Sequence, residues 1–193
     1  MAMYLTGNLN LFDQASAKEY GYDSVKDYYE DFAVQWTSTV TDNDQVFVLG
    51  NLSQYAPEAA LSFFQRLPGQ KQLVIGPRDQ ISPDTKKGWM TAHQYREAFI
   101  YSNTSMRRRM FGRDCILSYY GPEADVYWAP RPSEAFYLTA WQDIPEGEGE
   151  PWVNDSELSI SWNTWGRLID WDEVKEMFVG RQAYDAASHD MMN

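Results

Sequence analysis

The chain is poor in the side chains that most enzyme and metal sites require: its 193 residues include one cysteine and two histidines. Cys115 alone can form neither an internal disulfide nor a thiolate metal site, and the apolar run Cys115-Ile116-Leu117 predicts a small core residue. His93 and His189 lie outside any motif and are expected at the edge of the core or on the surface. No Ser-His-Asp set and no Gly-rich phosphate loop is recognisable, and the sequence predicts no cofactor.

Positive charge is also scarce, with 16 Lys+Arg against 28 Asp+Glu and a net charge of -12. Residues 1–122 hold 12 basic and 13 acidic side chains, whereas residues 123–193 hold 4 and 15. The acidic excess therefore belongs to the last third and argues against direct binding of nucleic acid or of an anionic membrane. One basic cluster, Arg107-Arg108-Arg109 with Arg113, is expected on a hairpin, whose alternation would leave these arginines solvated or ion-paired.

Long apolar segments are absent, and no window approaches the ~20 apolar residues of a membrane helix. The first residues, Met1-Ala2-Met3-Tyr4, lack the basic and apolar regions of a signal peptide, so we expect a cytoplasmic protein. What the chain has in quantity is aromatic residues, 8 Trp and 13 Tyr among them. This composition excludes disorder as the main state, and the length fits one domain that buries roughly 70% of its unfolded surface.

The first half alternates short apolar runs with amphipathic segments. The runs 3–5, 46–49 and 73–75 predict strands, each followed closely by a glycine. Ser24 predicts the N-cap of one helix, and Pro57 predicts the first turn of another. The order strand-helix-strand-helix-strand favours an α/β fold with a largely parallel sheet, in which ligands bind at the carboxyl ends of the strands.

The second half predicts a helix over 89–100, a hairpin of 105–110 with 114–120, and strands at 135–138 and 158–161. Asp172 is expected to cap a last helix that includes Met177 and Phe178. No internal boundary is evident. We therefore expect a single domain over residues 1–181 and a loose C-terminal tail over residues 182–193.

Five loop segments form an ordered series: 5–10, 48–52, 75–79, 117–120 and 138–141. Their order, strand context and spacing resemble the calcineurin-like metallophosphoesterases, especially the short form common in bacteria and bacteriophages, over residues 3 to 178. That family's pattern is Asp-x-His, Gly-Asp, Gly-Asn-His-(Asp/Glu), a His, and Gly-His-x-His. The resemblance implies a metallophosphoesterase-like α/β/β/α sandwich with mixed sheets, and a phage-encoded protein.

The family's metal ligands are almost all replaced. Asparagine offers only a neutral carbonyl oxygen, arginine places a permanent cation in a ligand loop, and tryptophan has no ligand atom, so two divalent ions cannot be held. The resemblance therefore implies a degenerate site that holds no metal. The corresponding positions, in family order, are Asn8, Asn10, Asn51, Pro77, Arg78, Asp79, Tyr119, Thr139 and Trp141, of which Asp79 alone agrees with the family.

Two interpretations remain open for the residues of this vestigial site. Asn8, Asn10 and Asn51 are either turn residues that follow strands or members of a retained polar pocket. Arg78 either forms a structural ion pair with Asp79 or receives a phosphate or carboxylate without metal.

The favoured function is that of a non-catalytic protein, a pseudoenzyme that binds a protein partner through an acidic, Trp-rich surface or through its metal-free cleft. Exposed tryptophans dominate many interfaces, and an acidic surface suits a basic partner, such as a host or virion protein. The candidate anchors in the acidic third are Trp128, Trp141, Trp152, Trp162 and Trp165.

Two other classes remain. The first is a phosphodiesterase with a rebuilt metal site that uses Asp13, Asp79 and a carboxylate of the acidic third. The second is an acidic decoy, in which residues 123–193 imitate the phosphates of nucleic acid and occupy a DNA- or RNA-binding protein.

Overall fold

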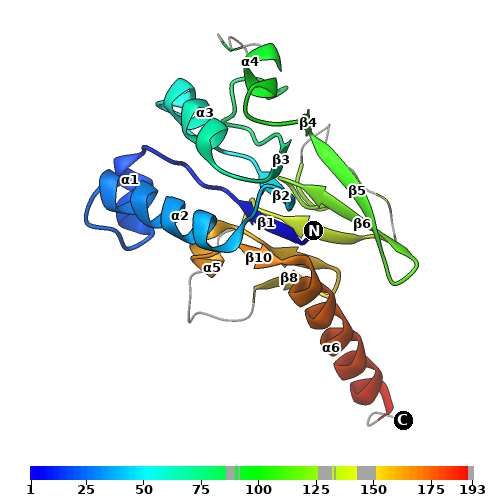
Figure 1. Ribbon diagram of the computed structural model, residues 1–193. Coiled ribbons are helices and arrows are strands. Elements are labelled where there is room, and N and C mark those ends of the chain that lie inside the picture. Colours follow the sequence, from blue (N-terminus) through cyan, green and yellow to red (C-terminus); the bar gives the residue numbers. More distant parts are fainter. Residues whose placement is uncertain (86–89, 91, 126–131, 133, 143–150, 191–193) are drawn as a thin grey trace.

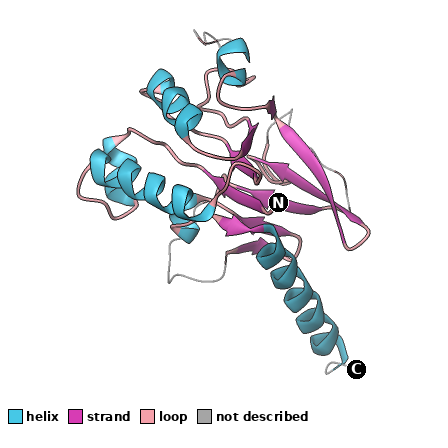
Figure 2. Ribbon diagram, viewed as in Figure 1, coloured by secondary structure: helices cyan, strands magenta, loops and turns pink. Residues whose placement is uncertain are grey.

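The computed structural model describes residues 1–85, 90, 92–125, 132, 134–142 and 151–190, with side chains described up to residue 181. Two mixed five-stranded sheets and the helices around them make up these residues (Figures 1 and 2). The predicted α/β class with mixed sheets is confirmed.

The first sheet has the order β10-β1-β2-β3-β4. Strands β1 to β4 are parallel to their neighbours, and β10 pairs antiparallel with β1. The parallel strands β1, β2 and β3 correspond to the three predicted apolar runs, so their carboxyl ends meet at one edge. The strands are β1 (Met3–Gly7), β2 (Gln45–Leu49), β3 (Gln70–Val74), β4 (Tyr101–Asn103) and β10 (Ile169–Asp170).

Five helices pack on one face of this sheet and enclose the larger hydrophobic core. Ser24 caps α2 as predicted, because its hydroxyl oxygen accepts a hydrogen bond from the backbone N–H of Asp27 at 3.1 Å. Pro57 opens α3, as predicted. The helices α1 and α5 were not predicted, since each is too short to show a periodic pattern. The five are α1 (Gln14–Glu19), α2 (Val25–Thr39), α3 (Pro57–Arg66), α4 (Ala92–Arg96) and α5 (Trp162–Trp165).

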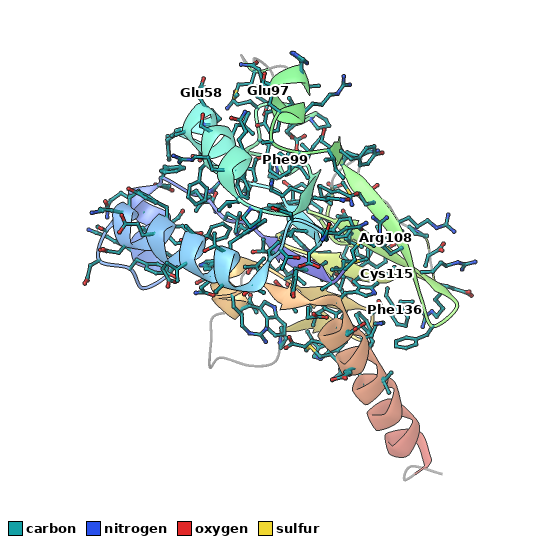
Figure 3. All side chains as sticks on the ribbon, viewed as in Figure 1. Glu58, Glu97, Phe99, Arg108, Cys115 and Phe136 are labelled. Atoms are coloured by element: carbon teal, nitrogen blue, oxygen red, sulfur yellow. The ribbon has the colours of Figure 1, made fainter. Side chains whose placement is uncertain are left out.

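The second sheet has the order β5-β6-β7-β9-β8 and faces the first across a second core. Cys115 and Phe136 lie side by side on β6 and β7 and belong to this core (Figure 3). Cys115 is fully buried, which confirms the predicted core residue, and burial raises the pKa of its thiol to about 12. The strands are β5 (Ser105–Met110), β6 (Arg113–Ser118), β7 (Phe136–Thr139), β8 (Trp152–Asn154) and β9 (Glu157–Ser159).

The last helix, α6 (Trp171–Asp190), lies beside β10 and β1 and extends away from the rest of the molecule (Figure 1). Its Val174 and Phe178 insert into the core between the sheets, so α6 closes one side of that core. The finer prediction, an α/β/β/α sandwich, stays a prediction. The structure differs from the predicted loose tail over residues 182–190, which continue α6: they lack proline and glycine, and helix propensity extends the helix where no apolar pattern exists.

The β5–β6 hairpin confirms the prediction of ion-paired arginines for Arg107 and Arg109 but not for Arg108, which is half-buried. Arg107 and Arg109 project to one side and form ion pairs with Asp114. Arg108 points to the other side, where its guanidinium lies 4.5 Å from the centre of the Phe47 ring. The strand's alternation thus splits the basic cluster between two faces.

Thr6 offers a test of the core on the helical side of the first sheet. Its hydroxyl is buried and has no hydrogen-bond partner in the described residues. Thr139 is equally buried, but its hydroxyl donates to Glu157 at 2.8 Å. We expect Thr6→Val to raise the free energy of unfolding by about 1 kcal/mol, because an unsatisfied hydroxyl is removed, and Thr139→Val to lower it by about 1–2 kcal/mol. Urea denaturation measures both, and destabilisation by Thr6→Val would show that its hydroxyl has a partner.

Candidate functional site

Three loops of the first sheet converge where its parallel strands end. Asn8 follows β1, Asn51 follows β2, and Asp79 lies shortly after β3. Asn8, Asn10 and Asn51 have φ angles of 51°, 46° and 51°, in the left-handed region that asparagine tolerates better than most residues. The three asparagines are therefore turn residues, as one of the two interpretations holds.

The same three asparagines also form a buried polar cluster with Tyr119, called here the asparagine cluster. The side-chain oxygen of Asn8 accepts hydrogen bonds from Nδ2 of Asn51 at 2.9 Å, Nδ2 of Asn10 at 3.1 Å and the Tyr119 hydroxyl at 3.1 Å. Nδ2 of Asn51 also donates to the Tyr119 hydroxyl at 2.7 Å. All four residues are at most 6% exposed, so their polar groups satisfy one another rather than water. The structure thus brings together four of the predicted site residues.

Arg78 lies at the surface beside this cluster and contacts it twice. Its backbone N–H donates to Oδ1 of Asn51 at 3.0 Å, and its Nη1 donates to Oδ1 of Asn10 at 3.1 Å. The guanidinium forms no ion pair with Asp79, so the predicted Arg78–Asp79 ion pair is wrong. The reason is that the two adjacent side chains diverge: Arg78 is exposed, and Asp79 is 1% exposed.

Asp79 instead joins the β2 and β3 loops through the backbone. Its Oδ2 accepts from the N–H groups of Gly76 at 2.8 Å and Asn51 at 3.1 Å, and its Oδ1 accepts from the N–H of Leu52 at 2.9 Å. Burial raises the pKa of Asp79 to about 6, although these three hydrogen bonds act in the opposite direction. Both oxygens serve as acceptors for loop amides.

The β2 and β3 loops approach so closely that glycine is required at their contact. A Cβ atom on Gly76 would lie 2.7 Å from the backbone nitrogen of Asn51, and one on Gly50 would lie 2.5 Å from Cα of Gly76. Gly50 also has a φ of 62°. This contact explains why a glycine follows each of the two predicted strands.

Thr139 and Trp141, which replace the two histidines of the last family motif, make their side-chain hydrogen bonds away from the asparagine cluster. Both donate to Oε1 of Glu157 at 2.8 Å, and Asn154 donates to its Oε2 at 3.3 Å. Glu157 is fully buried, and its carboxyl group packs where any side chain on Gly121 would lie. Sequence reasoning missed Glu157, since nothing distinguishes it there from the other acidic residues of the last third.

The described residues do not fit the two-metal centre of the family that the sequence resembles. The asparagine cluster supplies neutral amides and a hydroxyl where such a centre needs carboxylates and imidazoles. Asp13, suggested for a rebuilt site, caps α1 by accepting from the Ala15 N–H at 3.1 Å and the Ser16 hydroxyl at 2.8 Å. Within the described part of the chain, no group of three His, Cys, Asp or Glu side chains could hold a metal ion.

Among the candidate tryptophan anchors that the structure describes, Trp162 is buried and Trp141, Trp152 and Trp165 are half-buried. Trp162 is 1% exposed and packs on Phe32 with ring centres 4.8 Å apart, so the prediction is wrong for it. Trp152 is half-buried against Phe178, and the half-buried Trp165 donates its indole N–H to the Ser159 carbonyl at 2.8 Å. These three side chains therefore pack on the two hydrophobic cores. Trp128 lies outside the described residues.

Comparison with known proteins gives relatives in bacteriophages. No protein-family model matches the sequence. The chain is 24% identical over 172 residues to the Gene 66 protein of Mycobacterium phage L5, covering 80% of this chain and 83% of that one. It is 24% identical over 161 residues to the Gene 66 protein of Mycobacterium phage D29, covering 74% and 78%.

Among the described residues, no helix combines the length and apolarity needed to cross a membrane. A similar fold occurs in a solved structure, the protein of unknown function AQ665 from Aquifex aeolicus. The TM-score is 0.65 at 12% sequence identity, with 91% of this chain and 98% of that chain covered. At this identity the similarity concerns the fold alone.

Proposed function

We propose that the chain is a non-catalytic, metallophosphoesterase-like protein of a bacteriophage, which acts by binding a protein partner. The proposal accounts for two observations together. The loop motifs keep the order of the family, and almost all of their metal-ligand residues are replaced. The two phage relatives support its phage origin.

The observation that carries the proposal is the asparagine cluster. In it, amide donors and acceptors from the loops after β1 and β2 pair with each other and with Tyr119. A divalent cation needs anionic or otherwise uncommitted oxygens. Here the Asn8 oxygen already accepts three hydrogen bonds, and those of Asn10 and Asn51 accept from Arg78. The cluster therefore holds the loops together internally, as a metal would.

The partner is expected to be basic. The net charge is -12, and the acidic excess lies in residues 123–193. Among described residues of that third, Asp155 and Asp172 are exposed and Glu173 is half-buried, and each forms an ion pair with an Arg or Lys. Exposed pairs of this kind contribute little to stability, so a basic partner can replace them at low cost.

Metal binding and hydrolysis test the non-catalytic part. We expect isothermal titration with Mn²⁺ to show no stoichiometric binding, and bis-(p-nitrophenyl) phosphate with Mn²⁺ to show no turnover above a metal-free control. A catalytically active phosphoesterase of the same fold serves as the positive control. Turnover that Asp79→Ala abolishes, while Asp84→Ala retains it, would refute the proposal and favour the rebuilt phosphodiesterase.

The partner-binding part is tested by affinity capture from host lysate. We expect a specific basic protein, retained in moderate salt. Capture of a DNA- or RNA-binding protein that duplex DNA displaces, with steep salt dependence, would instead favour the acidic decoy. If no specific protein is captured, the binding proposal fails.

A further inference from the structure

Arg78 presents an exposed guanidinium at the carboxyl-end edge of the first sheet. This edge is where open α/β sheets bind their ligands. Its Nη1 hydrogen bond to Asn10 fixes the side chain in place, yet no carboxylate among the described residues lies within ion-pair distance of it.

Two aromatic side chains, Tyr20 and Tyr120, lie near this arginine, and a third, Trp141, packs beside Tyr120. The Tyr20 hydroxyl accepts from Nδ2 of Asn10 at 3.1 Å, next to the oxygen that Arg78 contacts. Burial and the charge of Asp84 raise the pKa of Tyr120, and the Arg78 charge is near enough to act in the opposite direction. The ring of Trp141 lies 6.2 Å from that of Tyr120, centre to centre. All three aromatic residues are half-buried, so together with Arg78 they form a solvent-accessible set, called here the Arg78 rim.

The geometry points to the Arg78 rim as a metal-free site for an oxyanion, a phosphate or a carboxylate. A guanidinium presents parallel N–H groups that match two oxygens of either anion, and such bidentate bonds are among the strongest in proteins. The aromatic neighbours suit a flat or apolar group attached to the anion. The inference rests on the metal-free part of the proposed function, since only there does a protein cation provide the positive charge.

A purely structural role of Arg78, holding Asn10, makes a different prediction. In that role, substitution of Arg78 changes the stability of the protein but does not change its binding of anions. The two roles separate in a titration, because an anion that docks on the guanidinium changes the environment of its Nε–H group without unfolding the protein.

Nuclear magnetic resonance of the arginine Nε–H and tryptophan indole groups provides the test. The intact protein is titrated at pH 7 and constant ionic strength with inorganic phosphate, acetate and adenosine monophosphate, with chloride as the reference anion. We expect a saturable shift of the Arg78 signal, and a shift of the Trp141 indole signal with the nucleotide. Arg78→Gln should weaken binding about tenfold or more, and Arg78→Lys should weaken it by a smaller factor because charge remains without the fork.

Arg66→Gln is the matched control, because Arg66 is also exposed but lies in the last turn of α3. It should bind as the wild type does. Melting temperatures of both Arg78 variants show whether the fold persists, and Arg78→Lys keeps the test valid if Arg78→Gln is unstable. Saturation by phosphate alone, by acetate alone or by both supports the site and identifies its ligand. No saturable shift, or an equal affinity in Arg78→Gln, overturns it, and neither result bears on metal binding or turnover.

Discussion

Replacing Asp79 by asparagine should destabilise the fold by about 2–3 kcal/mol, although the substitution is nearly isosteric. Three backbone N–H groups, those of Asn51, Leu52 and Gly76, donate to the two carboxyl oxygens. An asparagine has one acceptor oxygen, so its NH₂ group would face at least one of these donors and leave it unsatisfied. Chemical denaturation of the variant measures the loss. Asp84→Asn, an exposed position five residues on, should change stability by at most about 0.5 kcal/mol.

The pH dependence of stability provides a second test of the role of Asp79. Burial raises its pKa to about 6 from the ordinary 3.8, so between those values the folded state binds more protons than the unfolded state. The contribution of Asp79 is therefore complete below pH 3.8 and is lost as the pH rises through 6, a change of about 3 kcal/mol. Asp79→Asn should lack this dependence. A wild-type stability that rises over this window relative to the variant would show that the three hydrogen bonds outweigh burial.

Replacing Asn51 by aspartate should cost about 3 kcal/mol at pH 7. Nδ2 of Asn51 donates to the Asn8 oxygen and to the Tyr119 hydroxyl. The introduced carboxylate would place an anionic oxygen against the Asn8 oxygen in a site that excludes water. Its pKa in the folded state should be raised for this reason, so the destabilisation should become smaller as the pH falls. Thermal and chemical denaturation at pH 5 and pH 7 measure both effects.

Asn43→Asp provides the matched control, since Asn43 is exposed in the turn before β2 and should tolerate the change within about 0.5 kcal/mol. Mn²⁺ should not restore the stability of Asn51→Asp, because Asn8, Asn10 and Tyr119 still offer neutral partners. If Mn²⁺ stabilised this variant far more than the wild type, one substitution would have recovered a metal site. The asparagine cluster would then be a recently lost centre rather than an internal replacement.

Local sequence patterns predicted much of the fold. The apolar run 46–49 predicted a strand, and β2 places Val46 and Val48 in the helical core and Phe47 and Leu49 between the sheets. Ser24, Pro57 and the hairpin of 105–110 with 114–120 were predicted from local patterns and are confirmed. These features depend on propensities within a few residues, which is why the sequence alone reveals them.

Contacts set by the tertiary structure determine the arrangement of the candidate site. The predicted ion pair between Arg78 and Asp79 fails because burial separates two adjacent side chains, a property of the fold rather than of the dipeptide. The sequence predicted that the tryptophans of the acidic third are surface anchors, yet Trp162 packs in the core beside α2. Composition cannot tell a core aromatic residue from an exposed one.

The sequence by itself determined the alternating α/β order, the glycines that follow β2 and β3, and the absence of a metallophosphoesterase ligand set. Each of these depends on residue type at a position. The tertiary structure alone decided that three asparagines from two loops satisfy one another, that Asp79 accepts hydrogen bonds from loop amides, and that Glu157 accepts them from Thr139 and Trp141. Those pairings join residues up to 43 positions apart. Only the packing of the two sheets determines which polar groups lose water together and must therefore find partners.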